Sequence, residues 1–208
     1  MKALFLNCSL KKSDEESNTQ ALCAYAQRIF EKESVTCEHI RVVDYYIPFG
    51  MKERVDSKDD WPSLFAKVMA SQILIIGTPI WFGEKSSVAS LVIERLYAFS
   101  AEKNDVGQYI YYNKVAGVIA TGNEDGGKES CRSVLYALQH MGFTIPPQAD
   151  AYWVGEAGPG PSYIEEGQDN AFTQRNTQFL TYNLLHVARM LDKQPIPAIG
   201  NVRLETSS

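Results

Sequence analysis

The sequence predicts an α/β fold in three layers, with a parallel β-sheet covered on both faces by helices. Hydrophobic runs of strand length alternate five times with amphipathic stretches of helical period, and the connections between them are short. The chain has 208 residues, of which 45% are hydrophobic, and this is enough for one domain with a sizeable core. We expect a single domain over residues 1–192 and a poorly ordered tail over residues 193–208.

The first three elements are predicted to be a strand, a helix and a strand. Residues 3–6 (ALFL) form a continuous apolar run, which is typical of a strand buried on both faces. From Asn18 onward apolar residues recur at helical spacing, and Ser17 or Asn18 can cap the start of that helix. Residues 35–43 are rich in β-branched side chains and alternate in part, which predicts a second strand nearer the edge of the sheet.

An irregular stretch over residues 44–60 precedes the next helix. Asp59 or Asp60 can cap this helix, and Trp61 and Pro62 lead into it. The alternation of strands and helices therefore resumes after residue 60.

The middle of the chain contains the most apolar strand. Residues 72–77 (QILIIG) are expected to end before Pro79, because proline cannot donate a hydrogen bond to a neighbouring strand. A third helix is predicted over residues 86–100, a fourth strand over 114–120 and a fourth helix over 126–142.

The last part of the chain completes the pattern. Residues 143–145 and 149–154 predict a fifth strand that two prolines interrupt. A Gly/Pro-rich loop over residues 155–169 is either a lid or interface arm, or a long surface connection. A final helix is predicted over residues 171–192.

Composition excludes several classes of partner. Lys and Arg number 20 against 25 Asp and Glu, so the net charge is −5, and we expect no nucleic-acid partner. The amino-terminal apolar run is shorter than that of a secretion signal and no segment approaches membrane-spanning length, so we expect a cytoplasmic protein without a membrane partner. The four cysteines match neither metal-ligand spacing nor a disulfide framework, which predicts reduced, packed thiols and no metal site.

Three loops could bind a ligand, because open parallel sheets bind ligands beyond the carboxyl ends of their strands. The first loop, residues 7–19, is rich in hydroxyl groups and opens a helix. Its Ser9, Ser17 and Thr19 side chains, with the free N–H groups of the helix, could hold a phosphate. The alternative is an ordinary turn with a helix cap, and the acidic run over residues 14–16 disfavours a phosphate unless it faces water.

The second loop, residues 78–87, places large apolar groups just beyond a buried strand. Ile80, Trp81 and Phe82 could form the wall of a site for a planar heterocycle, and the backbone N–H groups from Trp81 to Gly83 could bond its polar edge. The alternative is that Trp81 and Phe82 cover the core or form a subunit contact.

The third loop, residues 121–127, is rich in glycine. Gly122, Gly127 and Lys128 fit the first part of a nucleotide-phosphate pattern, but Glu129 stands where a Ser or Thr would coordinate magnesium. A nucleoside triphosphatase is therefore disfavoured, and a turn whose backbone approaches a ligand edge is the better interpretation.

Three sets of residues together carry a resemblance to a known family. These are Ser9 with residues 17–19 (SNT), residues 77–83 (GTPIWFG) followed by Ser86 and a helix, and Thr121-Gly122 with Gly126-Gly127. In this order, over about residues 2–145, they resemble the flavodoxin-like NAD(P)H-dependent FMN reductases and NAD(P)H:quinone oxidoreductases.

The resemblance implies a flavodoxin-like, doubly wound sheet of five parallel strands in the order 2-1-3-4-5, with non-covalent FMN at the strand ends. The first loop would bind the phosphate, and the second and third loops would line the isoalloxazine. By position, the implied cofactor-binding residues are Ser9, Lys11, Ser17, Asn18, Thr19, Pro79, Ile80, Trp81, Phe82, Gly83, Thr121, Gly122, Asn123 and Gly126.

The implied activity is an FMN-dependent NAD(P)H oxidoreductase that reduces quinone, flavin, azo or nitro acceptors by two-electron hydride transfer, as a homodimer or homotetramer. Because the flavin carries the chemistry, no catalytic side chain is expected. His39, His140 and His186 are accordingly expected at the surface or on helices. Two alternatives remain: a flavodoxin-type electron carrier that does not oxidise NAD(P)H directly, and a flavin-free structural or regulatory subunit.

Overall fold

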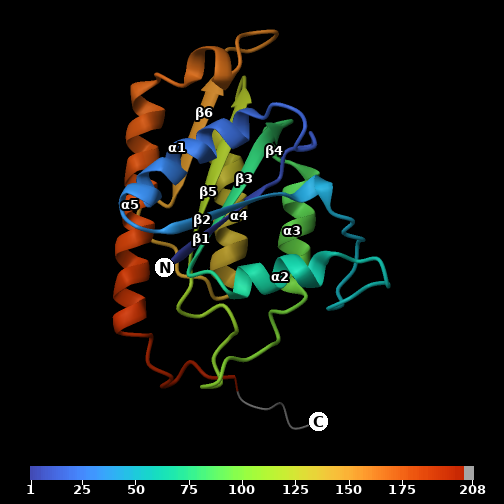
Figure 1. Cartoon of the computed structure of the whole chain (residues 1–208), viewed down its shortest axis with the longest axis vertical. Helices are drawn as coiled ribbons and strands as arrows, with labels where there is room; N and C mark the ends of the chain where they lie inside the picture. The colour runs from blue at the N-terminus through green and yellow to red at the C-terminus, as the bar shows by residue number, and fades with distance from the viewer. Residues whose placement is uncertain (204–208) are drawn as a thin grey trace.

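The computed structural model describes residues 1–203 and has the predicted three layers, with a sheet between two layers of helices (Figure 1). The strands lie in the order β2-β1-β3-β5-β6, and the short β4 pairs with β3 off this path. Since β4 is antiparallel, the five parallel strands follow the predicted 2-1-3-4-5 order.

The strands are β1 (Lys2–Asn7), β2 (Thr36–Arg41), β3 (Ile73–Trp81), β4 (Glu84–Lys85), β5 (Val115–Asn123) and β6 (Asp150–Gly155). The helices are α1 (Asn18–Lys32), α2 (Trp61–Met69), α3 (Ser87–Tyr97), α4 (Gly127–His140) and α5 (Ala171–Lys193).

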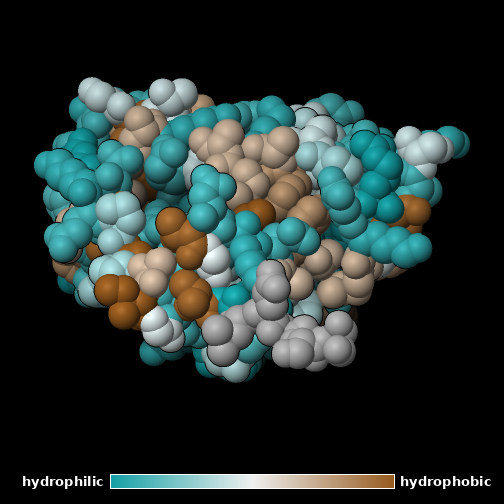
Figure 2. Space-filling view, turned by 90° about the horizontal axis from the view of Figure 1, so that it is seen from below, coloured by the Kyte–Doolittle hydropathy of each residue, from teal (hydrophilic) through white to brown (hydrophobic). Residues whose placement is uncertain are grey.

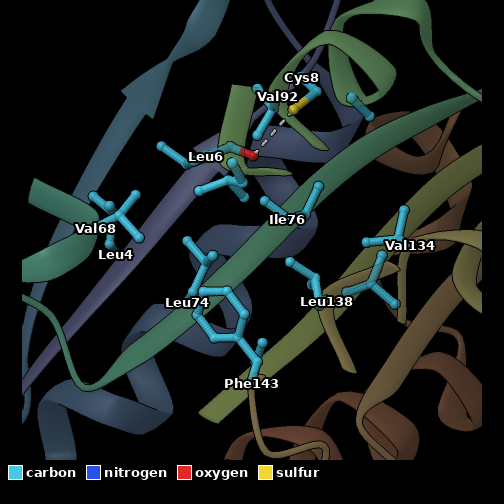
Figure 3. Packing of buried hydrophobic residues seen from close by; sticks show 14 of the residues in the cluster. Leu4, Leu6, Cys8, Val68, Leu74, Ile76, Val92, Val134, Leu138 and Phe143 are labelled. Carbon is cyan, nitrogen blue, oxygen red and sulfur yellow. Dashed lines mark hydrogen bonds between the residues drawn. The ribbon is translucent and has the colours of Figure 1, made fainter. Parts of the chain in front are cut away.

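Each face of the sheet has its own hydrophobic core. On one face α2, α3 and α4 cover the strands, and Figure 3 shows Ile76 of β3 in this core with Val92 and Leu138 from the helices. On the other face α1 and α5 cover the sheet. Leu4 and Phe5 belong to opposite cores, which explains why β1 is a continuous apolar run rather than an alternating one.

Side chains accept hydrogen bonds from backbone N–H groups at the starts of four helices. Ser17, Ser86 and Asn170 each accept a hydrogen bond from a backbone N–H in the first turn of α1, α3 and α5. At the start of α2 the N–H of Trp61 donates to Asp59 Oδ1 at 2.9 Å. These caps satisfy N–H groups that have no partner within the helix.

The prediction that the third strand ends before Pro79 is wrong, because β3 continues to Trp81. β1 ends opposite Gly77, whose carbonyl accepts a hydrogen bond from the N–H of Cys8 at 2.7 Å. Alternate residues of a strand face the same neighbour, so Pro79 also faces the β1 side, beyond the end of that strand. The missing N–H of Pro79 therefore interrupts no hydrogen bond between strands.

Three other strand boundaries differ from the prediction. β5 runs to Asn123, so the start of the third loop is strand rather than turn. β2 is shorter than predicted because η1 (Val42–Asp44), a 3-10 turn, follows it. Residues 143–145 form no strand; Thr144 makes an isolated bridge to Val115, and the fifth parallel strand is β6 alone.

The end of the described chain packs against the loop between α3 and β5, whereas the sequence predicted a loose tail. Gln108 Nε2 donates to the carbonyls of Ile196 (3.1 Å) and Pro197 (3.2 Å), and the N–H of Arg203 donates to the Gly107 carbonyl (2.9 Å). Figure 2 views this end of the molecule, where hydrophobic residues lie among hydrophilic ones. The rest of the predicted tail, residues 204–208, lies outside the described residues. Over residues 1–203, no helix is both long and apolar enough to cross a membrane.

Candidate functional site

A cavity of about 780 Å³ lies at the carboxyl ends of the strands, where the order reverses between β1 and β3. It brings all three predicted loops together. Its lining contains every predicted cofactor-binding residue except Gly126, and five that sequence reasoning missed. The lining residues are Ser9, Leu10, Lys11, Glu16, Ser17, Asn18, Thr19, Pro79, Ile80, Trp81, Phe82, Gly83, Thr121, Gly122, Asn123, Glu124, Asp125 and Trp153.

The first loop is held at both ends by side chains. Asn7 Oδ1 accepts from the N–H of Ser9 at 2.9 Å, and Ser9 Oγ accepts from the N–H of Lys11 at 3.3 Å. At the other end Ser17 Oγ accepts from the N–H of Gln20 at 3.2 Å and caps α1. The amino end of α1, which carries a partial positive charge, therefore forms part of the cavity wall.

The charges of the cavity are mixed. Its described lining has one cation, Lys11, and three carboxylates, Glu16, Glu124 and Asp125. The acidic run over residues 14–16 is exposed to solvent, so its carboxylates are screened by water. The binding of an anion at this end of the cavity would therefore depend on hydrogen bonds from backbone N–H groups and hydroxyls more than on the net charge of the lining.

A chain of hydrogen bonds links the first loop to β2. Because Asn7 Oδ1 accepts from a backbone N–H, its Nδ2 is the donor to Gln20 Oε1 at 3.0 Å. Gln20 Nε2 must then donate to His39 Nδ1 at 2.9 Å, so neutral His39 carries its proton on Nε2. The ring of His39 stacks on Phe5 at 4.2 Å. The expectation that all three histidines lie at the surface or on helices is thus wrong for His39.

This environment makes stability depend on pH. Burial lowers the pKa of His39 from 6.5 to about 4, with a smaller opposing effect of Glu31. Below pH 6.5 the unfolded chain binds a proton at this residue that the folded chain does not, so stability falls as pH drops from 6.5 to 4. We expect His39 to contribute a loss of up to about 3 kcal/mol across this interval.

Urea unfolding of wild type and His39→Gln at several pH values measures this effect. The difference in unfolding free energy between the two proteins should change between pH 6.5 and 4 and stay constant above pH 7. His186→Gln, which removes an exposed histidine on α5, is the control. A difference independent of pH would contradict the expected titration.

The second loop is a β-hairpin, which the sequence did not predict. Trp81 pairs with Glu84, which leaves Phe82 and Gly83 as a two-residue turn with φ of +52° and +75°. A positive φ is strained for a bulky residue such as phenylalanine. The side chains of Trp81 and Phe82 are 50% and 103% exposed, so the alternative that they cover the core is wrong.

The third loop contacts both of the others. Thr121 Oγ1 and Thr19 Oγ1 share a hydrogen bond of 2.8 Å, so the buried Thr19 hydroxyl joins two loops. Gly126 has φ of +82°, and a Cβ there would lie 2.4 Å from the Cα of Gly83. Gly126 thus lies behind the hairpin and supports the cavity wall rather than lining it.

The Gly/Pro-rich loop over residues 155–169 lies at the rim of the cavity. The N–H of Ile164 donates to Asn18 Oδ1 at 2.9 Å, and Asn123 Nδ2 contacts the carbonyl of Gly160 at 3.4 Å. The loop contains the helical turn η2 (Tyr163–Gly167), and the ring of Tyr163 packs edge-on against Trp153 at 5.8 Å. Two predicted cofactor-binding residues, Asn18 and Asn123, therefore also hold this loop.

The five missed lining residues have local explanations. Four of them flank predicted residues within the first and third loops: Leu10, Glu16, Glu124 and Asp125. Neither their charge nor their hydropathy indicates that they line a cavity. Trp153 lies near the carboxyl end of β6, and the predicted span of the fifth strand was the signal that could have found it.

The arrangement suits a planar ligand that carries an anionic group. Exposed aromatic rings and the backbone of the hairpin lie on one side, and hydroxyls with a helix amino end lie on the other. The volume falls within the range of about 300–1,000 Å³ typical of sites for small molecules and cofactors.

Comparison with known proteins gives a family match and relatives that align over most of this chain. A family model described as NADPH-dependent FMN reductase matches residues 1–157. The 8-demethyl-8-aminoriboflavin-5′-phosphate synthase of Streptomyces davaonensis is 38% identical over 205 residues, which cover 94% of this chain and 80% of that protein. A crystal structure of RosB with the bound intermediate 8-demethyl-8-formylriboflavin-5′-phosphate has a TM-score of 0.87 and 34% identity, over 100% of this chain and 92% of that one.

A further relative is much longer than this chain. The protein named divalent metal cation transporter MntH of Mycobacterium bovis is 48% identical over 198 residues, which cover 92% of this chain. The chain spans 29% of the length of that protein.

Proposed function

Because the chain belongs to the NADPH-dependent FMN reductase family, we propose that it is an oxidoreductase that reduces a quinone, flavin, azo or nitro acceptor by two-electron hydride transfer. FMN is the cofactor and NAD(P)H the reductant of this family. We further propose that it acts in the cytoplasm as a homodimer or homotetramer.

One observation carries the proposal: three loops from separate parts of the chain form one cavity with an aromatic side and a hydroxyl-rich side. The residues fit FMN. The phosphate would be held by Ser9, Lys11 and the start of α1, and the isoalloxazine would lie against the hairpin from Pro79 to Gly83. Thr121, Gly122 and Asn123 would line the remaining edge.

In this site the chain binds and orients rather than reacts. The chemistry that bound FMN would supply is hydride transfer from NAD(P)H and electron transfer to the acceptor. Trp81 and Phe82 would cover the ring face against water, and backbone N–H groups of the hairpin would stabilise negative charge on the ring edge. No acid or base side chain is required for this chemistry.

A second candidate is that a flavin phosphate is the substrate rather than the cofactor. The Streptomyces relative is named as a synthase of a modified flavin phosphate, and the RosB structure holds such a compound. Mass measurement of the flavin recovered after turnover separates the candidates. An unchanged mass supports the reductase, and a changed mass supports flavin modification.

The central experiment is anaerobic mixing of the FMN-loaded protein with NADPH or NADH while flavin absorbance is followed. We expect bleaching, followed by recovery when a quinone is added. A protein that binds FMN but is not bleached would instead be an electron carrier. A chain that takes up no FMN on reconstitution would be a flavin-free subunit, and the proposal would be wrong.

Replacing Trp81 with alanine tests the aromatic side of the cavity. We expect FMN affinity to fall roughly tenfold, because a stacked aromatic ring contributes about 1–2 kcal/mol. Titration of the apo-protein with FMN, followed by flavin fluorescence, gives the affinity. Tyr136→Ala is the matched control, since this exposed tyrosine of α4 does not line the cavity. Equal FMN affinities for the Trp81 variant and wild type would show that the hairpin is not part of the FMN site.

A further inference from the structure

We propose that Arg41, a residue of the edge strand β2 that does not line the cavity, positions the first loop for the phosphate of FMN. This inference rests on the proposed function, because it assigns the first loop to a flavin phosphate. It concerns the selectivity of the site for FMN over riboflavin.

The guanidinium of Arg41 binds the backbone of the first loop directly. Its Nη1 donates to the carbonyl of Lys11 at 2.7 Å and to the carbonyl of Lys12 at 2.6 Å. Arg41 is 9% exposed, and β2 lies at the edge of the sheet (Figure 1). Hydrogen bonds from a charged donor are stronger than neutral ones, so this buried contact fixes two consecutive peptide carbonyls.

A second contact from the same region holds the peptide between Lys12 and Ser13 from its N–H side. Asp44, in the turn that follows β2, accepts a hydrogen bond from the N–H of Ser13 through Oδ1 at 3.1 Å. Arg41 and Asp44 together tie residues 11–13 to the end of β2. We call these two side chains the β2 clamp.

The β2 clamp orients a backbone donor. The N–H of Lys12 is antiparallel to the Lys11 carbonyl in a trans peptide, so it points away from the Arg41 guanidinium. It has no acceptor within residues 1–203. Lys11 itself lines the cavity. A free backbone N–H in a loop before a helix is the type of donor that binds phosphate.

Charge gives a reason for the clamp. Residues 11–16 carry two lysines and three carboxylates, so an unrestrained loop could bring its acidic run towards a phosphate. Arg41 adds a third cation beside the loop and fixes its backbone while Asp14 and Glu15, which do not line the cavity, stay in water. The clamp therefore acts through geometry and charge, without touching the ligand.

The first test compares FMN with riboflavin, which lacks the phosphate. We expect Arg41→Met to weaken FMN binding by about 10- to 100-fold, the range for losing one or two charge-assisted hydrogen bonds, and to leave riboflavin binding within about twofold. Arg41→Lys should recover part of the loss because an ammonium group can bond a carbonyl. Arg28→Met, which removes an exposed arginine of α1, controls for net charge.

The second test needs no cofactor. Trypsin cleaves after lysine, and the carbonyls that Arg41 holds belong to the peptide bonds after Lys11 and Lys12. In apo-protein we expect Arg41→Met to raise the rate of cleavage at these bonds by about 10- to 100-fold, relative to cleavage after exposed Lys58. Asp44→Ala should raise it in the same direction, and it serves as the second variant if Arg41→Met does not fold.

The outcomes separate the inference from the proposed function. Equal loss of FMN and riboflavin affinity, or no loss of either, would overturn the inference, and so would unchanged cleavage after Lys11 and Lys12. Wild-type protein that binds riboflavin as tightly as FMN would also overturn it. Wild-type protein that binds neither flavin would overturn the proposed function, and with it the phosphate role of the clamp.

Discussion

Replacing Arg95 with methionine is expected to lower the free energy of unfolding by about 3–5 kcal/mol. Arg95 of α3 and Asp59 form an ion pair of 2.8 Å in which both side chains are fully buried. The guanidinium also bonds the carbonyls of Pro48 (2.9 Å), Lys52 (3.1 Å) and Glu53 (3.2 Å), so it organises the irregular stretch between β2 and α2. The variant would leave a buried carboxylate and three carbonyls without this donor.

Urea unfolding with a set of partner variants measures the Arg95 effect. A double variant, Arg95→Met with Asp59→Asn, should be more stable than Arg95→Met alone because it no longer buries an unpaired carboxylate and keeps an acceptor for the Trp61 N–H. Arg132→Met removes an arginine from an exposed pair with Glu129 and should change stability little. The irregular stretch does not line the cavity, so folded Arg95→Met should keep its FMN affinity. A loss no larger than that of Arg132→Met would refute this role of the buried pair.

Replacing Gly126 with alanine is expected to weaken FMN binding at least about tenfold and to lower stability by about 2–4 kcal/mol. Two costs combine. The φ of +82° is unfavourable for alanine, and its Cβ would lie 2.4 Å from the Cα of Gly83 and 2.5 Å from its carbonyl oxygen. Because the atoms that this Cβ would meet belong to the backbone, they cannot rotate away as a side chain could. The hairpin must therefore move away from α4, and the aromatic wall of the cavity moves with it.

Gly158 offers a matched control for this prediction. Its φ is +81°, nearly the same as at Gly126, but an added Cβ would meet nothing within 4 Å. Gly158→Ala therefore carries the backbone strain without the contact, and we expect it to cost about 1 kcal/mol and to leave FMN affinity unchanged. Chemical unfolding and FMN titration of both variants are the measurements. Equal FMN affinities for the two variants would show that the contact with the hairpin does not shape the site.

The sequence was sufficient for several features whose controlling interactions are local. The cap at Ser17, the apolar run of β1 and the alternation of strands with helices all depend on neighbours a few residues apart, and all of them are found in the structure. The order of the strands came from the resemblance rather than from periodicity. Placing the first, second and third loops at one cavity followed from the general rule for parallel sheets.

Two of the features that the sequence did not reveal depend on distant partners, and a third, the hairpin, is local. Arg41 lies about 30 positions from the carbonyls it binds, and nothing in the local pattern of β2 marks it as a residue of the first loop. His39 appeared to have no partner because Gln20 and Phe5 come from other elements. The hairpin was missed because Phe82 occupies a turn position that normally favours asparagine or glycine.

The end of β3 has one further consequence, for how the protein avoids unwanted association. β3 runs on to Trp81 after β1 has stopped opposite Gly77, and its last two residues, Ile80 and Trp81, pair with the short antiparallel strand β4. A bare strand edge with free N–H groups can recruit another extended chain. Pro79 has no N–H to offer at this edge. The residue that seemed to end the strand thus leaves an incoming strand no backbone donor between the end of β1 and the residues that pair with β4.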